Sequence, residues 1–257
     1  MLTQERKDRI LEQLRRDGSV LAQGLSAAFQ VSEDTVRRDL RELAAAGLLK
    51  RVYGGALPLA RASVLDVKQR ARESVGEKRA LATAAARLVE PGEVILVDGG
   101  TTNCLFAQAL PPELSVTIIT TSPAVALSLC NHPHVEIVLT GGKLLKRSGT
   151  STGPGAVDAL RAVRADLAVL GVCSLDADLG ITCAEMDEMY VKRAMLEAAG
   201  EVIAICTSDK IDSVSTHVVA PVTAITRLVT SAAVPEKSLG RLAERGVEVL
   251  RVAVGAP

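Results

Sequence analysis

Residues 93–102 read EVILVDGGTT, and this stretch combines a short apolar run, a pair of glycines and the start of an amphipathic segment. The apolar run predicts a strand, the glycines predict a tight turn, and the residues from Thr101 onward predict a helix. Backbone N–H groups of a glycine turn and of a helix N-terminus together form an anion site. The stretch therefore predicts a phosphate-binding loop, which would serve an enzyme, a cofactor-binding domain or a sensor equally well.

The rest of the C-terminal part alternates apolar runs with helical segments. The runs predicted as strands are residues 93–98, 115–120, 135–139, 166–172, 201–206, 227–230 and 247–252. Continuous apolar strands separated by helices are typical of a mostly parallel sheet that is covered on both faces. In such sheets a ligand binds beyond the carboxyl ends of the strands. The sequence therefore predicts an α/β domain with a ligand site at one edge of its sheet.

The loops that follow these strands are rich in glycine, serine, threonine and aspartate. They are residues 98–102, 120–123, 140–154, 173–182 and 207–211. Glycine amides and hydroxyl groups suit a phosphate, aspartates suit sugar hydroxyls, and lysines add positive charge. The candidate effector-binding residues in and beside these loops are Lys78, Asp98, Gly99, Gly100, Thr101, Thr102, Thr120, Thr121, Ser122, Gly141, Gly142, Asp176, Glu185, Lys192, Asp209 and Lys210. Each loop alone is also ordinary turn chemistry, so the prediction depends on the pattern that the loops share.

The first sixty residues predict a separate unit of three helices. Apolar residues recur at helical spacing in residues 3–16 and 19–30, with Val20 and Leu21 counted in the second helix. A third helix follows a short turn, and Ser32 is a favourable N-cap for it. This order of helices is typical of a helix-turn-helix domain.

The third helix has an apolar face and an arginine face. At about 100° per residue, Val36, Leu40 and Leu43 lie on one side of the helix. The opposite side carries Arg38 and Arg41, with Arg37 and Thr35 on its flanks. Arginine suits a recognition helix because its guanidinium makes bidentate hydrogen bonds to guanine or binds phosphate.

Residues 48–58, LLKRVYGGALP, predict two short strands around a glycine pair, which is the pattern of a basic wing. The candidate DNA-binding residues of the helix and the wing are Ser32, Thr35, Arg37, Arg38, Arg41, Lys50 and Arg51. The alternative is that RRDLREL is only a solvated charged face of a small helical bundle. The order of the helices, the arginine face and the basic wing together favour DNA binding.

Composition supports two domains and places the positive charge in the first. The chain has 257 residues, and its 30 Lys and Arg balance its 30 Asp and Glu. Residues 1–62 nevertheless contain 11 Lys and Arg against 8 Asp and Glu, so the N-terminal part is basic. Aromatic residues make up 2% of the chain, which argues against binding of single-stranded nucleic acid by stacking.

Cysteine and histidine spacing predicts neither a metal site nor a cofactor. The five cysteines contain no C-x-x-C pair, and the three histidines are not spaced with them as zinc ligands. The odd number of cysteines favours reduced thiols in a reducing compartment. No apolar run reaches the roughly 18 residues of a membrane span, and the charged N-terminus has no apolar core of a signal peptide. We therefore expect a cytoplasmic protein that does not enter a membrane.

Two long stretches resemble one known family. Residues 5–56 resemble the helix-turn-helix domain of the DeoR/GlpR family of bacterial transcription regulators, through VSEDTVRRDLREL and GLLKRVYGGA. Residues 75–230 resemble the sensor domain of that family, through EKRALATAAARLVEPGEVILVDGGTT, LTGG, DLAVLG and VKRAM. The resemblance implies a sensor fold related to ribose-5-phosphate isomerase and CoA transferases, with a phosphorylated sugar or related metabolite as effector. Tyr53 stands where many members have histidine, and Thr121 stands where asparagine is usual.

The leading hypothesis is a transcription regulator, a repressor, that an effector controls. Residues 1–57 form a winged helix-turn-helix domain for double-stranded operator DNA, and residues 58–74 form a linker. Residues 75–257 form the α/β domain that binds the effector and assembles a homodimer or homotetramer. An effector that prefers one arrangement changes the spacing of the recognition helices and thereby the affinity for DNA.

The competing hypothesis is a sugar-phosphate isomerase-like enzyme that carries an N-terminal DNA-binding appendage. Such chemistry needs a carboxylate base near the sugar carbon. The corresponding loop of the related isomerases resembles GADE followed by a further aspartate, whereas residues 171–176 read GVCSLD and keep only Asp176. Glu185 is the other candidate base, and we assign no catalytic residue. A third hypothesis is a sensor of an unphosphorylated ligand, in which substitution of Lys78 or Lys192 would not weaken binding.

Overall fold

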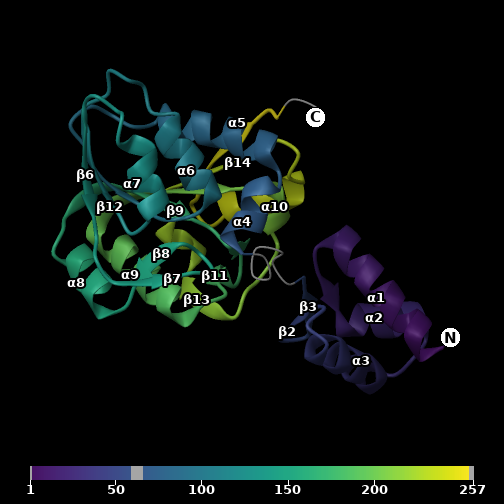
Figure 1. The fold of residues 1–257 in the computed structure, drawn as a ribbon. Coiled ribbons are helices and arrows are strands. Elements are labelled where there is room, and N and C mark those ends of the chain that lie inside the picture. The colour runs from purple at the N-terminus through teal and green to yellow at the C-terminus, as the bar shows by residue number, and fades with distance from the viewer. Residues whose placement is uncertain (1, 59–65, 255–257) are drawn as a thin grey trace.

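The computed structural model describes residues 2–58 and 66–254, which form two units (Figure 1). The N-terminal unit contains α1 (Thr3–Asp17), β1 (Val20–Leu21), α2 (Ala22–Phe29), α3 (Glu33–Ala45), β2 (Lys50–Val52) and β3 (Gly55–Leu57). Its strands form an antiparallel sheet in the order β1-β3-β2. The predicted winged helix-turn-helix, with Ser32 as the N-cap of α3 and two strands in the wing, is confirmed.

The start of the second predicted helix is a strand instead. Val20 and Leu21 form β1 and pair with Ala56 and Gly55 of β3, so that α2 begins only at Ala22. Val20 is buried and Leu21 is 65% exposed, which is the alternation of a strand. The prediction was wrong because the pairing partners lie 34 and 36 residues away, and local apolar spacing carries no information about them.

A buried ion pair joins α1 to α3 inside this unit. Arg6 Nε donates to Asp39 Oδ2 at 2.5 Å, and Arg6 Nη2 donates to Asp39 Oδ1 at 3.2 Å. The side chains of Arg6 and Asp39 are 6% and 0% exposed. The apolar core around them comprises Ile10, Leu14, Val20, Ala22, Leu25, Val36, Leu40, Leu43, Leu49 and Ala56. Asp39 therefore faces the core of the domain, although it stands among the arginines of α3 in the sequence.

The C-terminal unit alternates helices and strands. Its helices are α4 (Val67–Arg72), α5 (Val75–Ala86), α6 (Thr101–Gln108), α7 (Pro123–Leu129), α8 (Pro154–Arg161), α9 (Met186–Ala198) and α10 (Glu236–Ala243), with the short 3-10 turns η2 (Ser208–Lys210) and η3 (Val222–Ala224). Its strands are β4 (Val94–Val97), β5 (Val116–Thr120), β6 (Val135–Leu139), β7 (Lys143–Leu145), β8 (Thr150–Thr152), β9 (Ala165–Gly171), β10 (Ser174–Asp176), β11 (Gly180–Cys183), β12 (Ala199–Cys206), β13 (His217–Ala220), β14 (Arg227–Ser231) and β15 (Glu248–Val252).

Seven of these strands form one parallel sheet in the order β15-β14-β12-β9-β4-β5-β6. They are the seven strands predicted from the apolar runs, and each end lies within two residues of the predicted one. The chain enters the sheet at β4, continues outward through β5 and β6, and then returns to β9 on the other side of β4. The strand order reverses between β4 and β9, which is where a parallel sheet leaves room for a ligand.

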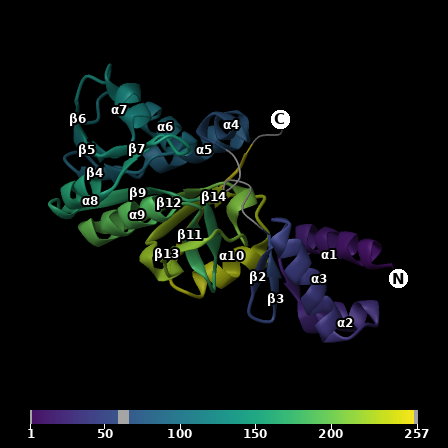
Figure 2. The same cartoon turned by 60° about the horizontal axis from the view of Figure 1, so that its bottom comes forward.

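Helices cover both faces of this sheet (Figure 2). α5, α6 and α7 pack on one face together with Ile95 and Val97, whereas α8, α9 and α10 pack on the other with Leu96. Neighbouring residues of β4 thus enter different cores, because side chains alternate along a strand. The predicted α/β class with a mostly parallel sheet is confirmed.

Two small antiparallel sheets were not predicted. They are the β7–β8 hairpin and the β10-β11-β13 sheet. Strands of three or four residues within glycine-rich and hydroxyl-rich loops give too short an apolar pattern to be recognised. Both small sheets pack against α9, the first through β8 and the second through β11 and β13.

The segment predicted as a linker, residues 58–74, contains α4. A capping box starts this helix, since Gln69 N donates to Asp66 Oδ1 at 2.8 Å and Asp66 N donates to Gln69 Oε1 at 3.0 Å. Residues 59–65 of the predicted linker lie outside the described residues. Among the helices that the structure describes, none combines the length and the apolar character required to cross a membrane.

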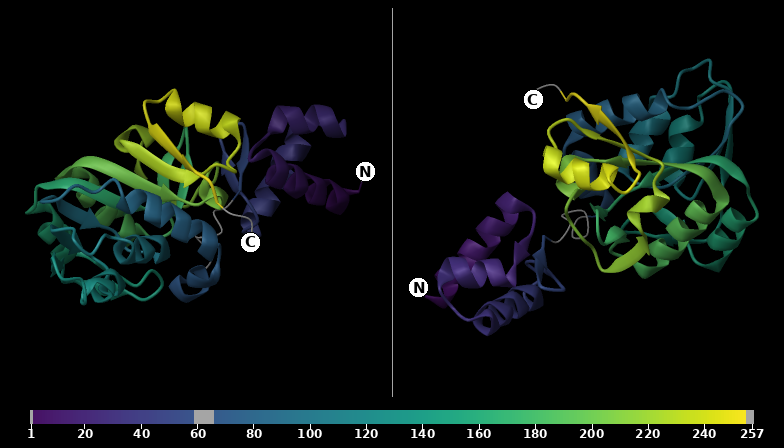
Figure 3. Two further views of the ribbon diagram at one scale, coloured as in Figure 1. Left: turned by 90° about the horizontal axis from the view of Figure 1, so that it is seen from above. Right: turned by 180° about the vertical axis from the view of Figure 1, so that it is seen from behind.

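The two units meet on the side of the C-terminal unit that carries α10 (Figure 3). Val214 N donates to Pro58 O at 3.3 Å. A Cβ on Gly18 would lie 3.4 Å from Asp212 Cβ, and Asp212 itself accepts a 2.5 Å hydrogen bond from Ser238 of α10. The turn after α1 and the end of the wing therefore contact the segment that follows η2.

Candidate functional site

α3 presents its basic side chains to solvent. Arg37, Arg38 and Arg41 are exposed, whereas the apolar side chains of the same helix are buried. Arg37 Nη2 donates to Glu33 Oε2 at 2.8 Å, which neutralises part of its charge within the helix. Arg38 and Arg41 form no ion pair with the residues that the structure describes. Their guanidinium groups are therefore available for an external anion.

Two further predicted DNA-binding residues form the cap of α3. Thr35 N donates to Ser32 Oγ at 3.2 Å, and the two hydroxyl oxygens lie 3.0 Å apart. Ser32 is exposed and Thr35 is half-buried. The cap fixes both residues at the start of the helix, and a contact of either with DNA stays a prediction.

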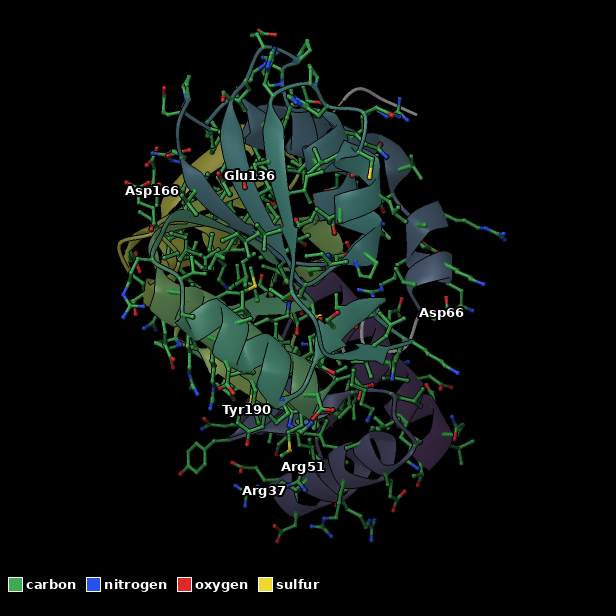
Figure 4. All side chains as sticks on the ribbon, turned by 60° about the vertical axis from the view of Figure 1, so that its left-hand side comes forward. Arg37, Arg51, Asp66, Glu136, Asp166 and Tyr190 are labelled. Atoms are coloured by element: carbon green, nitrogen blue, oxygen red, sulfur yellow. The ribbon has the colours of Figure 1, made fainter. Side chains whose placement is uncertain are left out.

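The wing lies beside α3 and adds to its positive charge. A small hollow between the two is lined by Ala22, Arg37, Leu40, Arg51, Val52, Gly54 and Gly55. Arg37 of α3 and Arg51 of β2 border this hollow together, and they lie close together in Figure 4. Arg51 and Tyr53 are exposed, and Lys50 is half-buried. The recognition helix and the wing thus form one continuous basic surface.

A second site lies in the C-terminal unit, beyond the carboxyl ends of β4, β9 and β12. It is a cleft with about 780 Å³ of space, part of which is open to solvent. Its lining residues are Arg70, Glu73, Ser74, Lys78, Gly99, Gly100, Thr101, Thr102, Asn103, Ser148, Gly171, Val172, Cys173, Glu188, Lys192, Ile205, Thr207, Asp209 and Lys210. The cleft is therefore at the point where the strand order reverses.

Glycines allow the loops of the two central strands to approach each other. A Cβ on Gly171 would lie 2.5 Å from Gly99 O, and a Cβ on Gly99 would lie 2.0 Å from Thr150 Cγ2. Gly100 has a φ of +117°, a conformation that residues with a side chain rarely adopt. α6 begins directly after it, and the N–H groups in the first turn of a helix have no partner within the helix. The residues of this turn line the cleft, and binding of an anion by their N–H groups stays a prediction.

Asp98 and Lys192 form a buried ion pair at the base of the cleft. Lys192 Nζ donates to Asp98 Oδ2, donates to Gly171 O at 2.6 Å, and lies 3.5 Å from Glu188 Oε1. Asp98 also accepts hydrogen bonds from Gly99 N at 2.7 Å and Gly171 N at 3.0 Å. Burial alone would lower the pKa of Lys192, but the charges of Asp98 and Glu188 outweigh it and raise the pKa. Lys192 thus ties α9 to the loops after β4 and β9.

Three other cationic side chains border the same cleft, namely Arg70 of α4, Lys78 of α5 and Lys210 of η2. Lys78 is 5% exposed, and its Nζ donates to Arg70 O. Burial, followed by the positive charge of Lys210, lowers the pKa of Lys78 to about 8, and Arg70 contributes in the same direction. An anion that entered the cleft would relieve this repulsion.

Half of the predicted effector-binding residues line the cleft. They are Lys78, Gly99, Gly100, Thr101, Thr102, Lys192, Asp209 and Lys210. Asp98 is not a lining residue itself, but it forms the ion pair with Lys192, which lines the cleft. The lining residues that sequence reasoning missed are Arg70, Glu73, Ser74, Asn103, Ser148, Gly171, Val172, Cys173, Glu188, Ile205 and Thr207. Of these, Gly171 and Val172 lie in the predicted strand 166–172, and Cys173 begins the predicted ligand loop 173–182.

The remaining candidates lie elsewhere. Thr120, Thr121 and Ser122 are buried after β5, where Thr120 Oγ1 donates to Val97 O at 2.6 Å and Ser122 caps α7. Gly141 and Gly142 are exposed after β6. The structure brings none of these five to the cleft lining, although Ser148, which follows Gly142 in the same predicted loop, lies there.

Two predicted acidic residues are engaged in local contacts outside the lining. Asp176 Oδ1 accepts hydrogen bonds from Asp178 N and Leu179 N, each at 2.9 Å, and so holds the turn between β10 and β11. Glu185 Oε1 accepts from Arg147 Nη1 at 3.1 Å, one residue before α9 begins. Both side chains therefore stabilise the small sheets beside the cleft.

Comparison with known proteins identifies both units. The family described as the DeoR-like helix-turn-helix domain matches residues 6–61, and the DeoR C terminal sensor domain matches residues 73–232. A putative aga operon transcriptional repressor of Escherichia coli O157:H7 is 33% identical over 256 residues, which cover 97% of this chain and 94% of that protein.

Two further proteins are similar to parts of the chain. The glycerol-3-phosphate regulon repressor of Escherichia coli strain K12 is 30% identical over 206 residues, which cover 80% of this chain and 82% of that one. The solved structure of ribose 5-phosphate isomerase A from Methanocaldococcus jannaschii is 19% identical, with a TM-score of 0.38 over 52% of each chain.

Proposed function

Because the chain belongs to the DeoR family of helix-turn-helix transcription regulators, we propose that a phosphorylated sugar or related metabolite binds its sensor-domain cleft and controls its affinity for DNA. The protein is a DNA-binding transcriptional repressor. The basic surface of α3 and the wing binds operator DNA, and the cleft binds the effector.

One observation supports a phosphorylated effector above all. Arg70, Lys78 and Lys210 border the cleft together with the first turn of α6. Burial of cations that repel one another costs free energy unless an anion compensates them. A phosphoryl group has the charge and the acceptor oxygens to compensate three cations and a helix N-terminus at once. An unphosphorylated sugar has no such charge.

The rest of the lining suits sugar hydroxyl groups. Asn103 Nδ2 donates to Asp98 O and Val169 O at 3.0 and 3.2 Å, while the buried Oδ1 has no partner among the described residues. Ser148 and Asp209 border the same space. We propose that Asn103 Oδ1 accepts a hydrogen bond from an effector hydroxyl.

A thermal-shift screen of the full chain tests the proposal. Each phosphorylated sugar is paired with its unphosphorylated parent, and the hits are added to complexes of the chain with a DNA site selected from a random library. A ligand of the folded state raises the apparent stability. Stabilisation by a phosphorylated compound, with a change in DNA affinity, supports the proposal. Equal stabilisation by parent sugars and phosphates would assign the cleft to an unphosphorylated ligand.

Arg38→Ala is expected to weaken binding to the selected DNA site by roughly ten- to a hundredfold, because one arginine contact to a base contributes about 1–3 kcal/mol. The measurement is a gel-shift titration at fixed salt concentration, since phosphate contacts make affinity depend on salt. Arg9→Ala is the matched control, because Arg9 is equally exposed but lies on α1 and pairs with Glu5 at 3.0 Å. An unchanged affinity for Arg38→Ala would remove this residue from the DNA surface.

Effector affinity is expected to fall as the pH rises through the pKa of Lys78, which is lowered to about 8. Below this pH the ammonium is charged and attracts the phosphoryl group, whereas above it the charge is lost. The dissociation constant of a phosphorylated hit should increase by up to about tenfold per pH unit above pH 8. Calorimetric titrations at about pH 7 and about pH 9 measure the change, since the phosphoryl group itself is largely dianionic over this range.

Lys78→Arg is the control for this titration, because a guanidinium stays charged at both pH values. The arginine variant is expected to bind with an affinity that no longer changes between the two conditions. A pH dependence that persists unchanged in Lys78→Arg would show that another group titrates.

The assembly and location follow from the mode of DNA binding. Helix-turn-helix proteins bind paired half-sites, so two recognition helices must be held at a fixed spacing. We therefore propose a homodimer or homotetramer assembled through the sensor domain, acting in the cytoplasm where the DNA is. Light scattering of residues 66–257 tests this role, because a monomeric fragment would exclude assembly through that domain.

We propose further that the cleft has no isomerase activity. The two repressors named above, which are 33% and 30% identical to this chain, are transcription regulators. Cys173 and Ser174 occupy the positions where an isomerase would carry acids, and burial raises the pKa of the Cys173 thiol. Asp176 is committed to a turn. An assay with ribose 5-phosphate tests this, because turnover by the purified chain would overturn it.

A further inference from the structure

α4 is a short helix that lies between two hollows and buries none of its residues. On one side it borders the effector cleft through Arg70, followed by Glu73 and Ser74. On the other side it borders an apolar hollow lined by Val67, Lys68, Ala71, Val75, Lys78, Thr101, Cys104, Leu105 and Ala124. The helix is thus only weakly packed against the sensor domain.

Hydrogen bonds join α4 to other parts of the sensor domain through Val67 and Arg70. Val67 N donates to Arg147 O at 2.9 Å, and Arg70 O accepts hydrogen bonds from Lys78 Nζ and from Glu73 N. The capping box of Asp66 and Gln69 joins these two residues to each other and so stabilises the helix itself. Elements with few buried apolar contacts open at low cost in free energy.

Arg70 has an unused donor that is buried. Its Nε has no hydrogen-bond partner within residues 2–58 and 66–254, although solvent does not reach the atom. A buried donor without a partner destabilises the folded chain. Arg70 lines the cleft beside Lys78, whose ammonium already bonds the Arg70 carbonyl. An acceptor that entered from the cleft would supply the missing partner.

We infer that Arg70 binds the anionic group of the effector and that the bound effector thereby fixes α4 against the sensor domain. This inference rests on the proposed function, because it assigns one wall of the same cleft to the segment that leads to the DNA-binding domain. A guanidinium suits this role because its fork of donors binds two phosphoryl oxygens at once.

Chain connectivity gives the contact a consequence for DNA binding. β3 of the wing ends at Leu57, and the capping box of α4 begins at Asp66, so eight residues join them. Fixing α4 therefore restricts where the DNA-binding domain can lie relative to the sensor domain. Two sites are coupled when a ligand at one changes the conformations open to the other.

The test uses the full chain and inorganic phosphate as the probe, since phosphate reports on the anion subsite without knowledge of the sugar. Calorimetric titration compares the unsubstituted chain with Arg70→Ala, Arg70→Lys and Arg72→Ala. Arg72 is the matched control, because it lies on the same helix, is exposed and does not line the cleft. We expect Arg70→Ala to weaken phosphate binding about ten- to a hundredfold, Arg70→Lys to weaken it less, and Arg72→Ala to leave it unchanged.

Hydrogen exchange of the amides of residues 67–72 measures the effect on α4. Phosphate at a saturating concentration should slow this exchange in the unsubstituted chain and in Arg72→Ala. In Arg70→Ala the phosphate concentration is raised until this variant is saturated as well, and the exchange should stay unchanged. The unfolding midpoint of each variant without phosphate shows that it is folded.

The outcomes separate the inference from the proposed function. If Arg70→Ala binds phosphate like the unsubstituted chain, or if phosphate leaves exchange in α4 unchanged, the inference on Arg70 is overturned while the anion site stands. If neither phosphate nor any phosphorylated sugar binds the unsubstituted chain, the proposed anion site fails and the inference fails with it.

Discussion

Asp39→Ala is expected to lower the free energy of unfolding of the DNA-binding domain by about 3–5 kcal/mol, because it leaves the guanidinium of Arg6 buried without its partner. The two side chains share two hydrogen bonds and are almost completely buried. A domain of this size has a total stability of only about 5–15 kcal/mol, so the loss removes a large part of it. The variant should lose DNA binding through unfolding, although Asp39 does not face the DNA surface.

Hydrogen exchange measures this effect domain by domain, since it reports α3 and α9 separately. Protection is expected to fall in α1 and α3 and to stay unchanged in α9. Glu42→Ala is the matched control, because Glu42 also lies on α3 and pairs with a residue of α1, Lys7, at 2.6 Å. Glu42 is exposed, so its removal should change protection little. Equal effects of the two substitutions would contradict the importance of burial.

The inward orientation of Asp39 could not be predicted from the sequence of the first domain. The helical spacing of apolar residues identified the helices. The arginines of α3 are exposed, in agreement with the predicted arginine face. An aspartate within RRDLREL gives no local sign that it faces inward, because its partner Arg6 lies 33 residues earlier. β1 was missed for the same reason, since its pairing with β3 is not local.

The large sheet was predictable because each of its strands is a continuous apolar run. Its strand order was not predictable, because nothing local in a run specifies its neighbour. This order decides which loops meet at the cleft. The predicted loops after β4, β9 and β12 all contribute lining residues, and the long predicted loop 140–154 after β6 contributes Ser148, whereas the loop after β5 contributes none. The sequence did not predict Arg70 at the cleft, because residues 58–74 were predicted to form a linker.

Lys192→Met is expected to lower the free energy of unfolding of the sensor domain by about 3–5 kcal/mol. Substitution of a lysine that only binds phosphate would instead lower the affinity for phosphate and leave this free energy unchanged. The sequence predicted a lysine that adds charge to the effector. The structure places Lys192 in an ion pair with Asp98, 94 residues away, with both side chains 1% exposed. Removing the ammonium leaves the carboxylate of Asp98 buried with only the N–H groups of Gly99 and Gly171 as partners.

Further variants decide whether Lys192 stabilises the fold or binds the effector. In Asp98→Asn combined with Lys192→Met, the buried charge is gone, so part of the lost stability should return. Recovery stays partial, because an amide in place of Asp98 presents only one acceptor to two N–H donors. Lys237→Met on the exposed face of α10 should leave stability unchanged. Urea unfolding of the unsubstituted chain, Asp98→Asn, Lys192→Met and the double variant, followed by circular dichroism, gives the four free energies of the cycle. If Lys192→Met instead unfolds like the unsubstituted chain and loses only phosphate affinity, Lys192 is a ligand of the effector, and the anion site extends from α4 across the cleft to α9.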